Sequence, residues 1–386
     1  MMTWQYLMGV RGLISRFIPD LIWVNNWHKR FGIYGFLLIS IHPTFMTIYY
    51  LSVGINFFIP TFSSHFDQFR LVGEIAYTIL LTTWLTSAIA RNRIPFRWWK
   101  RIHLLNLVIL PLALTHSLSI GTTLITSNLK YYWYTIAIIV TLILIYRLII
   151  YPLLGWGRLR YKVAAVHHLT GNIVQIDLKS MGNALQPIPG QFIYFRPLSS
   201  QETHPFTVSR FDSQSNQLSI SPKCSGPFSC KLQDIKPGEI AWIDGPYGVF
   251  TREAYTTEKP IVLVAGGIGI TPFIRLIEKL AAGWQKQVIL FYGNQTEQDV
   301  AYNELIENAA KANSNFKVVN IMSKQADYAG EKGYIDVSKL QKYLGENLSS
   351  YEFFLCGPEI MMAKITKDLK QSGVEKTSIH SERFSL

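Results

Sequence analysis

Two apolar stretches, HKRFGIYGFLLISIH at residues 28–42 and HLLNLVILPLALTH at residues 103–116, decide the fold of the first part of this chain. Each stretch begins and ends with a histidine. At about 1.5 Å of rise per residue, a helix places the two imidazoles of each stretch about 20 Å apart. Two such helices side by side can offer one histidine each at two depths of a membrane. This pattern predicts two metalloporphyrins, each held between the helices.

Four apolar segments are long enough to cross a bilayer, whose hydrocarbon core needs about 20 helical residues. We expect them at residues 31–51, 71–90, 102–120 and 132–153. The loop at 90–102 carries five Lys or Arg residues and residues 52–69 carry none, so the former is predicted to face the cytosol. The first and third segments are then parallel. This places His28 level with His103 and His42 level with His116, as the ligands of two haems.

The spacing of the histidines raises one difficulty. On an ideal helix, a spacing of 14 keeps His28 and His42 within about 40° of one face, whereas a spacing of 13 separates His103 and His116 by about 140°. Pro111 lies between the second pair and is expected to kink the helix and bring His116 round. The alternative for intramembrane histidines is an interhelical hydrogen bond.

Composition agrees with a chain that is part membrane protein and part soluble. The 386 residues are 49% hydrophobic and 16% charged, with a formal net charge of +12. The basic residues of the first part lie at the ends of apolar helices, so a lipid bilayer is the expected partner and nucleic acid is not. Cys224, Cys230 and Cys356 lack a metal-ligand spacing, and neither a disulfide framework nor a zinc site is predicted.

The pattern changes after residue 155. Short β-type runs between residues 161 and 253 predict an antiparallel barrel. Beyond residue 259, strands at 261–265, 288–292, 318–322 and 353–356 alternate with helices at 271–282, 300–312 and 359–371, which predicts a doubly wound parallel sheet. The expected domains are therefore a helical transmembrane domain (1–155), a β-barrel domain (156–255) and an α/β domain (256–386).

Two turns mark the ligand crevice of the α/β domain. The turn Gly-Gly-Ile-Gly-Ile-Thr-Pro at residues 266–272 ends one strand and opens a helix, where bare backbone amides can face a pyrophosphate. A second turn, Cys-Gly-Pro at 356–358, ends another strand. Either could be a plain strand–helix connection. The candidate nucleotide-binding residues are Gly266, Gly267, Gly269, Thr271, Pro272, Cys356, Gly357 and Pro358.

Further motifs complete a resemblance to a known family. The segment His204-Pro205-Phe206-Thr207 is similar to the flavin-binding segment of the ferric reductase and NADPH oxidase transmembrane family, whose bacterial NADPH-oxidase-like members carry a ferredoxin-reductase-like domain. The sequence Asp-Gly-Pro-Tyr-Gly at residues 244–248, with Gly245 and Pro246, resembles the second signature of that domain. The two turns and the histidine spacings of 14 and 13 also match, so the resemblance covers residues 9–386.

The resemblance implies roles for individual residues. Thr207 would hydrogen-bond the flavin ring, and His204 and Phe206 would contact the ring or its tail. Lys223, Gly226 and Ser229 would form the diphosphate clamp of FAD. Cys356 would lie beside the nicotinamide, and Phe384 would shield the flavin until nicotinamide displaces it. The implied cofactors are FAD, two haem b groups and NADPH or NADH. Residues 293–296 lack the arginine that grips a 2'-phosphate, although Lys324 could replace it.

The expected function is transmembrane electron transfer from cytosolic NAD(P)H, through FAD and two haems, to an acceptor outside the plasma membrane. Dioxygen, giving superoxide, is favoured over ferric iron. A ferric-chelate reductase, or a membrane-anchored flavin reductase without haem, stays open as an alternative. His65 and Asp67 in the outer loop could attract a cation. No obligatory activating subunit is expected. Family members usually have six spanning helices, so this chain is expected to start within the second.

Overall fold

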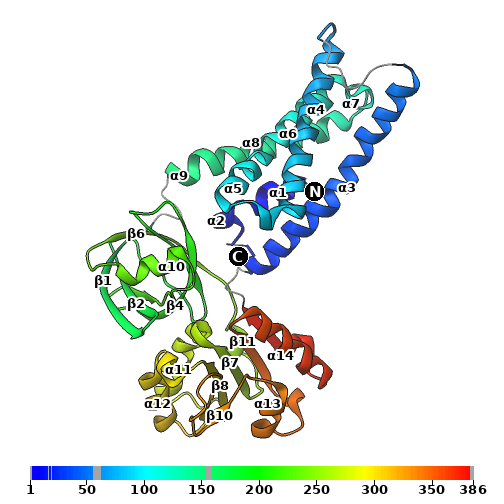
Figure 1. The fold of residues 1–386 in the computed structure, drawn as a ribbon. Coiled ribbons are helices and arrows are strands. Elements are labelled where there is room, and N and C mark those ends of the chain that lie inside the picture. The colour runs from blue at the N-terminus through cyan, green and yellow to red at the C-terminus, as the bar shows by residue number, and fades with distance from the viewer. Residues whose placement is uncertain (1, 16, 19, 55–61, 154–158, 383–386) are drawn as a thin grey trace. The chain divides into compact units, whose positions relative to one another are not determined.

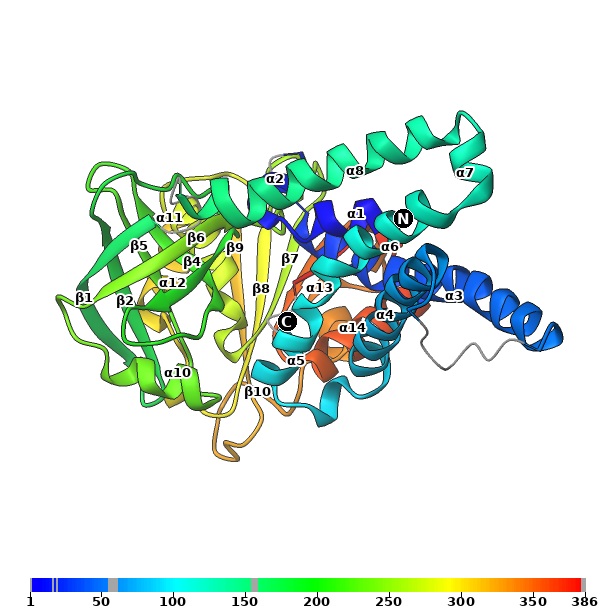
Figure 2. The same ribbon diagram turned by 90° about the horizontal axis from the view of Figure 1, so that it is seen from above.

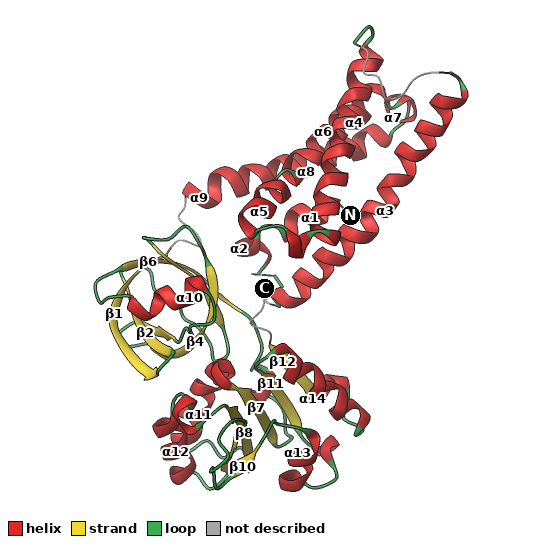
Figure 3. Cartoon of the chain, viewed as in Figure 1, coloured by secondary structure: helices red, strands yellow, loops and turns green. Residues whose placement is uncertain are grey.

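The structure is a computed structural model that describes residues 2–15, 17–18, 20–54, 62–153 and 159–382. It contains two compact units, Met1–Trp156 and Gly157–Leu386. Figure 1 shows the course of the chain, and Figure 3 separates a helical unit from a unit that contains the strands.

Unit 1 contains four helices that are long and apolar enough to span a membrane, at Trp23–Ser52, His65–Ile89, Phe96–Ile120 and Leu129–Ile150. The four predicted spans are thus confirmed, although the first begins earlier than expected and includes His28. The elements are α3 (Leu21–Ser52), α4 (His65–Trp84) with a π-helical extension (Leu85–Ile89), α5 (Phe96–Leu104), α6 (Asn106–Ile120), α7 (Thr122–Thr126), α8 (Leu129–Ile145) with a second π-helical extension (Tyr146–Ile150), and α9 (Tyr151–Leu153). Large apolar side chains on their outer faces, such as Phe45 (68% exposed), suit contact with lipid.

The N-terminal segment forms two short helices, α1 (Met2–Met8) and α2 (Arg11–Ile14). α1 lies among α3, α6 and α8 (Figures 1 and 2). Tyr6 is buried there against Leu110, Leu114 and Val140. This segment is therefore a packed part of the helical unit.

The third span is interrupted at Leu105, six positions before the Pro111 at which the sequence predicts a kink. Pro111 has no N–H and lies inside α6, and the helix is interrupted at Leu105, whose N–H bonds to Ile102 O in a tightened turn. The Tyr6 hydroxyl is inserted one residue before the proline, because it donates to Asn106 O (2.6 Å) and accepts from Leu110 N (3.2 Å). A side chain inserted into the helical hydrogen bonds is a recognised cause of bending.

The first part of unit 2 is a closed barrel with the strand order β1-β2-β5-β4-β3-β6. Each pair of neighbouring strands in this barrel is antiparallel, as predicted. The strands are β1 (Leu159–Thr170), β2 (Ile173–Ser180), β3 (Phe192–Pro197), β4 (His204–Asp212), β5 (Gln217–Ile220) and β6 (Ile240–Tyr247), and the short helix α10 (Pro227–Lys231) follows β5. Inward side chains such as Ile176, Ile193 and Phe195 fill the barrel.

The second part of unit 2 is a parallel sheet with the order β10-β9-β8-β7-β11-β12. Its strands are β7 (Ile261–Gly266), β8 (Val288–Asn294), β9 (Phe316–Met322), β10 (Glu331–Lys332), β11 (Glu352–Cys356) and β12 (Ile379–Glu382). Helices α11 (Ile274–Ala281) and α12 (Asn303–Ala312) cover one face, and α13 (Val337–Leu344) and α14 (Glu359–Gln371) cover the other. The strand order reverses between β7 and β11, which is where such sheets bind ligands.

One sequence-based expectation is wrong. Cys224 and Cys230, six positions apart in the sequence, form a disulfide. The spacing matched no disulfide framework, but the turn between β5 and α10 folds back and brings the two sulfurs together. Cys356 is a free, buried cysteine.

Candidate functional site

In unit 1 the four histidines form two facing pairs. The ring centroids of His28 and His103 are 6.1 Å apart, and those of His42 and His116 are 6.4 Å apart. The rings of each pair are steeply inclined to each other, at 70° and 63°. The pairing expected from span direction is therefore present, despite the spacing of 13 in the third span.

These separations discriminate between two interpretations. A direct hydrogen bond with nitrogens about 2.9 Å apart would put the ring centres about 5 Å apart. Two imidazoles that bind one metal at about 2.0 Å each have ring centres about 6.2 Å apart. The observed 6.1 and 6.4 Å fit a shared metal. Each pair thus offers two imidazole ligands, the number of axial ligands that a haem iron takes. Among the described residues, no group of three or more His, Cys, Asp or Glu could hold a metal.

His116 is held by the neighbouring helix α4. Its Nδ1 lies 2.8 Å from Phe69 O. A carbonyl oxygen only accepts, so Nδ1 carries the proton and Nε2 keeps the lone pair that binds a metal. Gly73 permits this approach, because a Cβ at that position would lie 2.5 Å from His116 Nδ1.

His103 is held by Trp99 of its own span and by Ser87 of the preceding span. Its Nδ1 lies 3.3 Å from Ser87 Oγ, and its ring stacks on Trp99 at 4.8 Å. Trp99 Nε1 donates to the same Ser87 oxygen (3.2 Å). These contacts orient the ring by its Nδ1 edge and leave Nε2 for a ligand.

The outer-loop residues His65 and Asp67 do not form a cation site in the described structure. Ser64 caps α4 by accepting from the Asp67 N–H, and the Asp67 carboxylate accepts from the Ser63 and Ser64 hydroxyls and pairs with Arg70 at 4.0 Å. His65 stacks on Phe69 at 4.6 Å. Asp67 is thus used by the fold rather than offered to an ion.

In unit 2 the proposed flavin segment forms the start of β4. Thr207 is 5% exposed, and its hydroxyl has no hydrogen-bond partner among the described residues. Buried hydroxyls are normally paired, so this one points to a missing polar group. His204 stacks on Phe228 at 4.0 Å, whereas Phe206 packs against the barrel core. Pro205 pairs with Tyr194 of β3 in the barrel.

The second signature lies beside this segment. Gly245 and Pro246 are joined by a cis peptide bond near the end of β6. A Cβ at Gly248 would lie 3.2 Å from Phe192, which pairs with Thr207 across β3 and β4, and 3.7 Å from Glu382 Oε1. The loop after β6 therefore joins the flavin segment to the end of the parallel sheet.

The two turns of the parallel sheet meet at the reversal of strand order. Ala265 pairs with Cys356, and a Cβ at Gly266 would lie 2.7 Å from Pro358 Cδ. A Cβ at Gly269 would collide with Cys356 O, and Gly357 also packs on Gly266. These glycines are explained by close packing between the turns.

The first turn differs in detail from the expectation. It continues as a 3₁₀ helix (Gly267–Phe273), and the α-helix begins only at Ile274. Thr271 donates its hydroxyl to Ile268 O, and Pro272 is buried, so both shape the turn. Gly267 has a φ of +54°, and a Cβ there would lie 3.6 Å from Lys223 Nζ. The Lys223 ammonium of the barrel thus lies beside the glycine turn.

The loop after Lys223 has its backbone organised by a side chain. Ser229 Oγ accepts from the N–H groups of Ser225 (3.0 Å) and Gly226 (3.1 Å). Small residues and a lysine at the border of two nucleotide-binding parts suit a diphosphate.

Sequence reasoning missed Glu382, which pairs with Cys356 in neighbouring strands. Burial raises the pKa of Glu382 to about 8, and its Oε2 has no partner among the described residues. Burial, and then the nearby Glu382, raise the pKa of the Cys356 thiol. Burial therefore favours the uncharged form of both groups. No local pattern marks such a carboxyl as buried. Phe384 lies outside the described residues.

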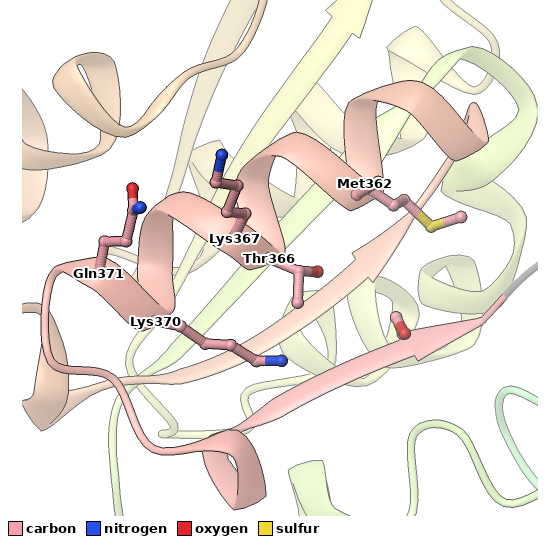
Figure 4. A pocket seen from close by; sticks show the side chains of 7 residues that line it. Met362, Thr366, Lys367, Lys370 and Gln371 are labelled. Atoms are coloured by element: carbon pink, nitrogen blue, oxygen red, sulfur yellow. The ribbon is translucent and has the colours of Figure 1, made fainter.

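A pocket on α14 is separate from this site. Lys367 and Lys370 line it together with Ser381 of β12 (Figure 4). None of the predicted site residues contributes to its lining.

Comparison with known families divides the chain in the same way. Residues 1–114 match the ferric reductase like transmembrane component, residues 158–251 an FAD-binding domain, and residues 263–367 an oxidoreductase NAD-binding domain.

Two similar proteins are electron transfer components or subunits by name. The chain is 25% identical to the toluate 1,2-dioxygenase electron transfer component of Pseudomonas putida, over 58% of this chain and 66% of that protein. It is 31% identical to a probable dihydroorotate dehydrogenase B (NAD(+)) electron transfer subunit of Pyrococcus abyssi, over 51% and 68%. The chain thus spans about two thirds of the length of these relatives. The FAD/NAD-binding domain of nitric oxide dioxygenase from Vibrio cholerae has the same fold, with 23% identity, 58% and 98% coverage and a TM-score of 0.51.

Proposed function

We propose that this chain, which contains a ferric reductase like transmembrane component, an FAD-binding domain and an oxidoreductase NAD-binding domain, moves electrons from NADH, through FAD and two b-type haems, to dioxygen outside the membrane. The relatives named above support the flavin and nicotinamide half of this proposal. The two histidine pairs support the membrane half.

The observation that carries the proposal is the separation of the paired imidazoles. His28 and His103 would hold the inner haem, and His42 and His116 the outer haem. Two histidines on each iron leave no open coordination position. The acceptor therefore collects electrons at the edge of the outer haem.

When bound, FAD converts hydride transfer into single-electron transfer, and the haems relay single electrons. The residues of unit 2 bind and orient these groups. The unpaired Thr207 hydroxyl would donate to the flavin, and Lys223 with the nearby amides would hold diphosphate charge. Cys356 and Glu382 would line the nicotinamide site in neutral form, with Phe384 against the flavin.

NADH is favoured over NADPH by the residues that follow β8. Glu297 accepts from Gln325 Nε2 at 2.8 Å and donates its N–H to Gln325 Oε1 at 2.9 Å. A carboxylate near the end of this strand suits a ribose 2'-hydroxyl and repels a 2'-phosphate. Lys324 beside it is exposed and would offset this repulsion only in part.

The charge of the loops sets the proposed orientation. The five basic residues between the second and third spans favour a cytosolic location for that loop, and for unit 2, in a plasma-membrane protein. The inner pair then faces the flavin side and the outer pair the external side.

Dioxygen is the proposed acceptor. Arg70, next to Phe69 whose carbonyl holds His116, is buried and ion-paired with Asp67 at 4.0 Å and Glu74 at 3.6 Å. These carboxylates offset the charge that would attract an anionic ferric chelate, whereas neutral dioxygen needs no such charge. The test is cytochrome c reduction by the purified protein with NADH, in iron-free buffer. Superoxide dismutase should abolish the reduction. Activity that appears only with a ferric chelate would instead identify a ferric reductase, and a preparation without haem bands would favour a flavin reductase.

A further inference from the structure

The disulfide between Cys224 and Cys230 encloses the loop assigned above to the FAD diphosphate. The loop reads Cys-Ser-Gly-Pro-Phe-Ser-Cys, so Gly226 and Ser229 lie inside it, and Lys223 directly precedes it. Both cysteines are only half-buried, and Ser225 and Pro227 of the loop are exposed. Reagents in solution can therefore reach this bond.

The rest of the loop is held by few interactions. The Cys224 N–H donates to Asn172 O at 2.8 Å, and the Cys230 N–H donates to Gly226 O at 2.9 Å. Inside the loop, the Ser229 hydroxyl oxygen accepts hydrogen bonds from the N–H groups of Ser225 and Gly226. The disulfide is the one covalent link across the described loop, so it limits how far these weaker contacts can open.

The loop is also connected to the flavin segment. Phe228, at the centre of the loop, is buried and stacks on His204 at 4.0 Å. His204 begins the strand that carries the unpaired Thr207 hydroxyl. A shift of the loop would thus move residues at both the diphosphate end and the ring end of the proposed FAD site.

We propose that Cys224 and Cys230 form a redox-responsive clasp, which strengthens FAD binding when oxidised and weakens it when reduced. This inference rests on the proposed function, because it needs the FAD site and the cytosolic location. In reducing compartments, disulfides are usually transient and sense redox state. Cys356 is not the responding thiol, because it is fully buried.

The chemistry of the clasp is thiol–disulfide exchange. A thiolate of a cellular dithiol attacks one sulfur, the bond between Cys224 and Cys230 breaks, and a mixed disulfide forms. The second thiolate of the dithiol then displaces the protein cysteine. Two electrons reach the cysteine pair, each sulfur takes a proton, and the dithiol becomes a disulfide. In the reverse direction, hydrogen peroxide oxidises the two thiols to the disulfide and is reduced to two molecules of water.

The effect on FAD follows from preorganisation. Cutting the cross-link lets the loop sample open conformations, and the cofactor must then order it on binding. We expect the dissociation constant of FAD to rise about tenfold, which corresponds to about 1.4 kcal/mol.

The test uses the full chain in detergent, stripped of FAD. Native protein is alkylated before and after treatment with dithiothreitol, and the labelled cysteines are located by mass spectrometry. We expect no label before reduction, and label on Cys224 and Cys230 but not on Cys356 afterwards. FAD is then titrated anaerobically into the oxidised and the reduced protein, with flavin fluorescence as the readout.

A variant with both Cys224→Ser and Cys230→Ser should bind FAD as the reduced protein does, with or without dithiothreitol. Equal FAD affinity of the oxidised and reduced wild-type protein would overturn the clasp, and so would labelling of both cysteines before reduction. Failure of FAD to bind in either state would instead refute the flavin site of the proposed function.

Discussion

The substitution Gly73→Ala tests the outer haem site without touching a ligand. A Cβ on α4 at this position would lie 2.5 Å from His116 Nδ1, 2.7 Å from Cε1 and 2.9 Å from Cγ. Ordinary contact between such atoms needs about 3.5 Å, so the ring must retreat by about 1 Å. The bond from Nδ1 to Phe69 O, now 2.8 Å, would then be lost.

A metal–nitrogen bond tolerates a change of only about 0.2 Å. Loss of a partner that orients a ligating histidine typically costs about 10–100-fold in metal affinity. We therefore expect the purified variant to contain about one haem where the wild type contains two, measured as pyridine haemochrome. Reduction of external acceptors should fall in parallel, whereas reduction of bound FAD by NADH should be unchanged.

Gly32→Ala is the matched control. Gly32 also lies inside a spanning helix, but the nearest atom to a Cβ there is Gln5 Nε2 at 3.8 Å. Alanine favours a helix over glycine by about 1 kcal/mol, so neither change should weaken its own helix. Two haems and full external activity in Gly73→Ala would refute the reasoning, because His116 would then not depend on its contact with α4.

Four further changes test other parts of the chain. Tyr6→Phe removes the hydroxyl inserted into α6, so unfolding free energy should fall by about 1–3 kcal/mol; an unchanged melting temperature would contradict this. Thr207→Ala should raise the FAD dissociation constant about fivefold, a loss of about 1 kcal/mol, and leave the melting temperature of FAD-free protein unchanged, since the hydroxyl has no partner among the described residues. Because burial raises the pKa of Glu382 from 4.5 to about 8, the folded protein keeps a proton that the unfolded chain releases, and this contribution to stability is lost as pH rises through that window. The melting temperature of Glu382→Gln minus that of the wild type should therefore increase between pH 5 and pH 8. A difference that stays constant over this range would argue against a buried carboxyl. Glu297→Arg should shift the ratio of kcat/KM for NADPH over NADH upward by at least about tenfold, and a constant ratio would place cofactor choice elsewhere.

Much of the fold could be predicted because its signals are local. A hydropathic run of about 20 residues spans a membrane wherever it occurs, and each of the four expected spans is present. The barrel and the parallel sheet likewise followed from alternating and continuous apolar runs. Histidine depth followed from span direction, and the pairs His28–His103 and His42–His116 bear this out.

The features that the sequence did not predict depend on contacts between distant segments. The sequence marked only Pro111 in the third span, but the Tyr6 hydroxyl, from about 100 positions away, bonds to Asn106 O and Leu110 N there. The disulfide between Cys224 and Cys230 matched no known spacing. Glu382 could not be recognised as buried from the sequence, because one buried carboxyl produces no repeating pattern of residues.

The sequence by itself therefore determined the kinds of elements, their order and the cofactor classes that their motifs favour, since each depends on neighbouring residues and on the period of a helix or strand. Only the tertiary structure decided how far apart the imidazoles stand, which hydroxyl and carboxyl groups lack partners, and which cysteines meet. Those properties depend on contacts between segments that are distant along the chain, and a single sequence records the residues but not their separation in space.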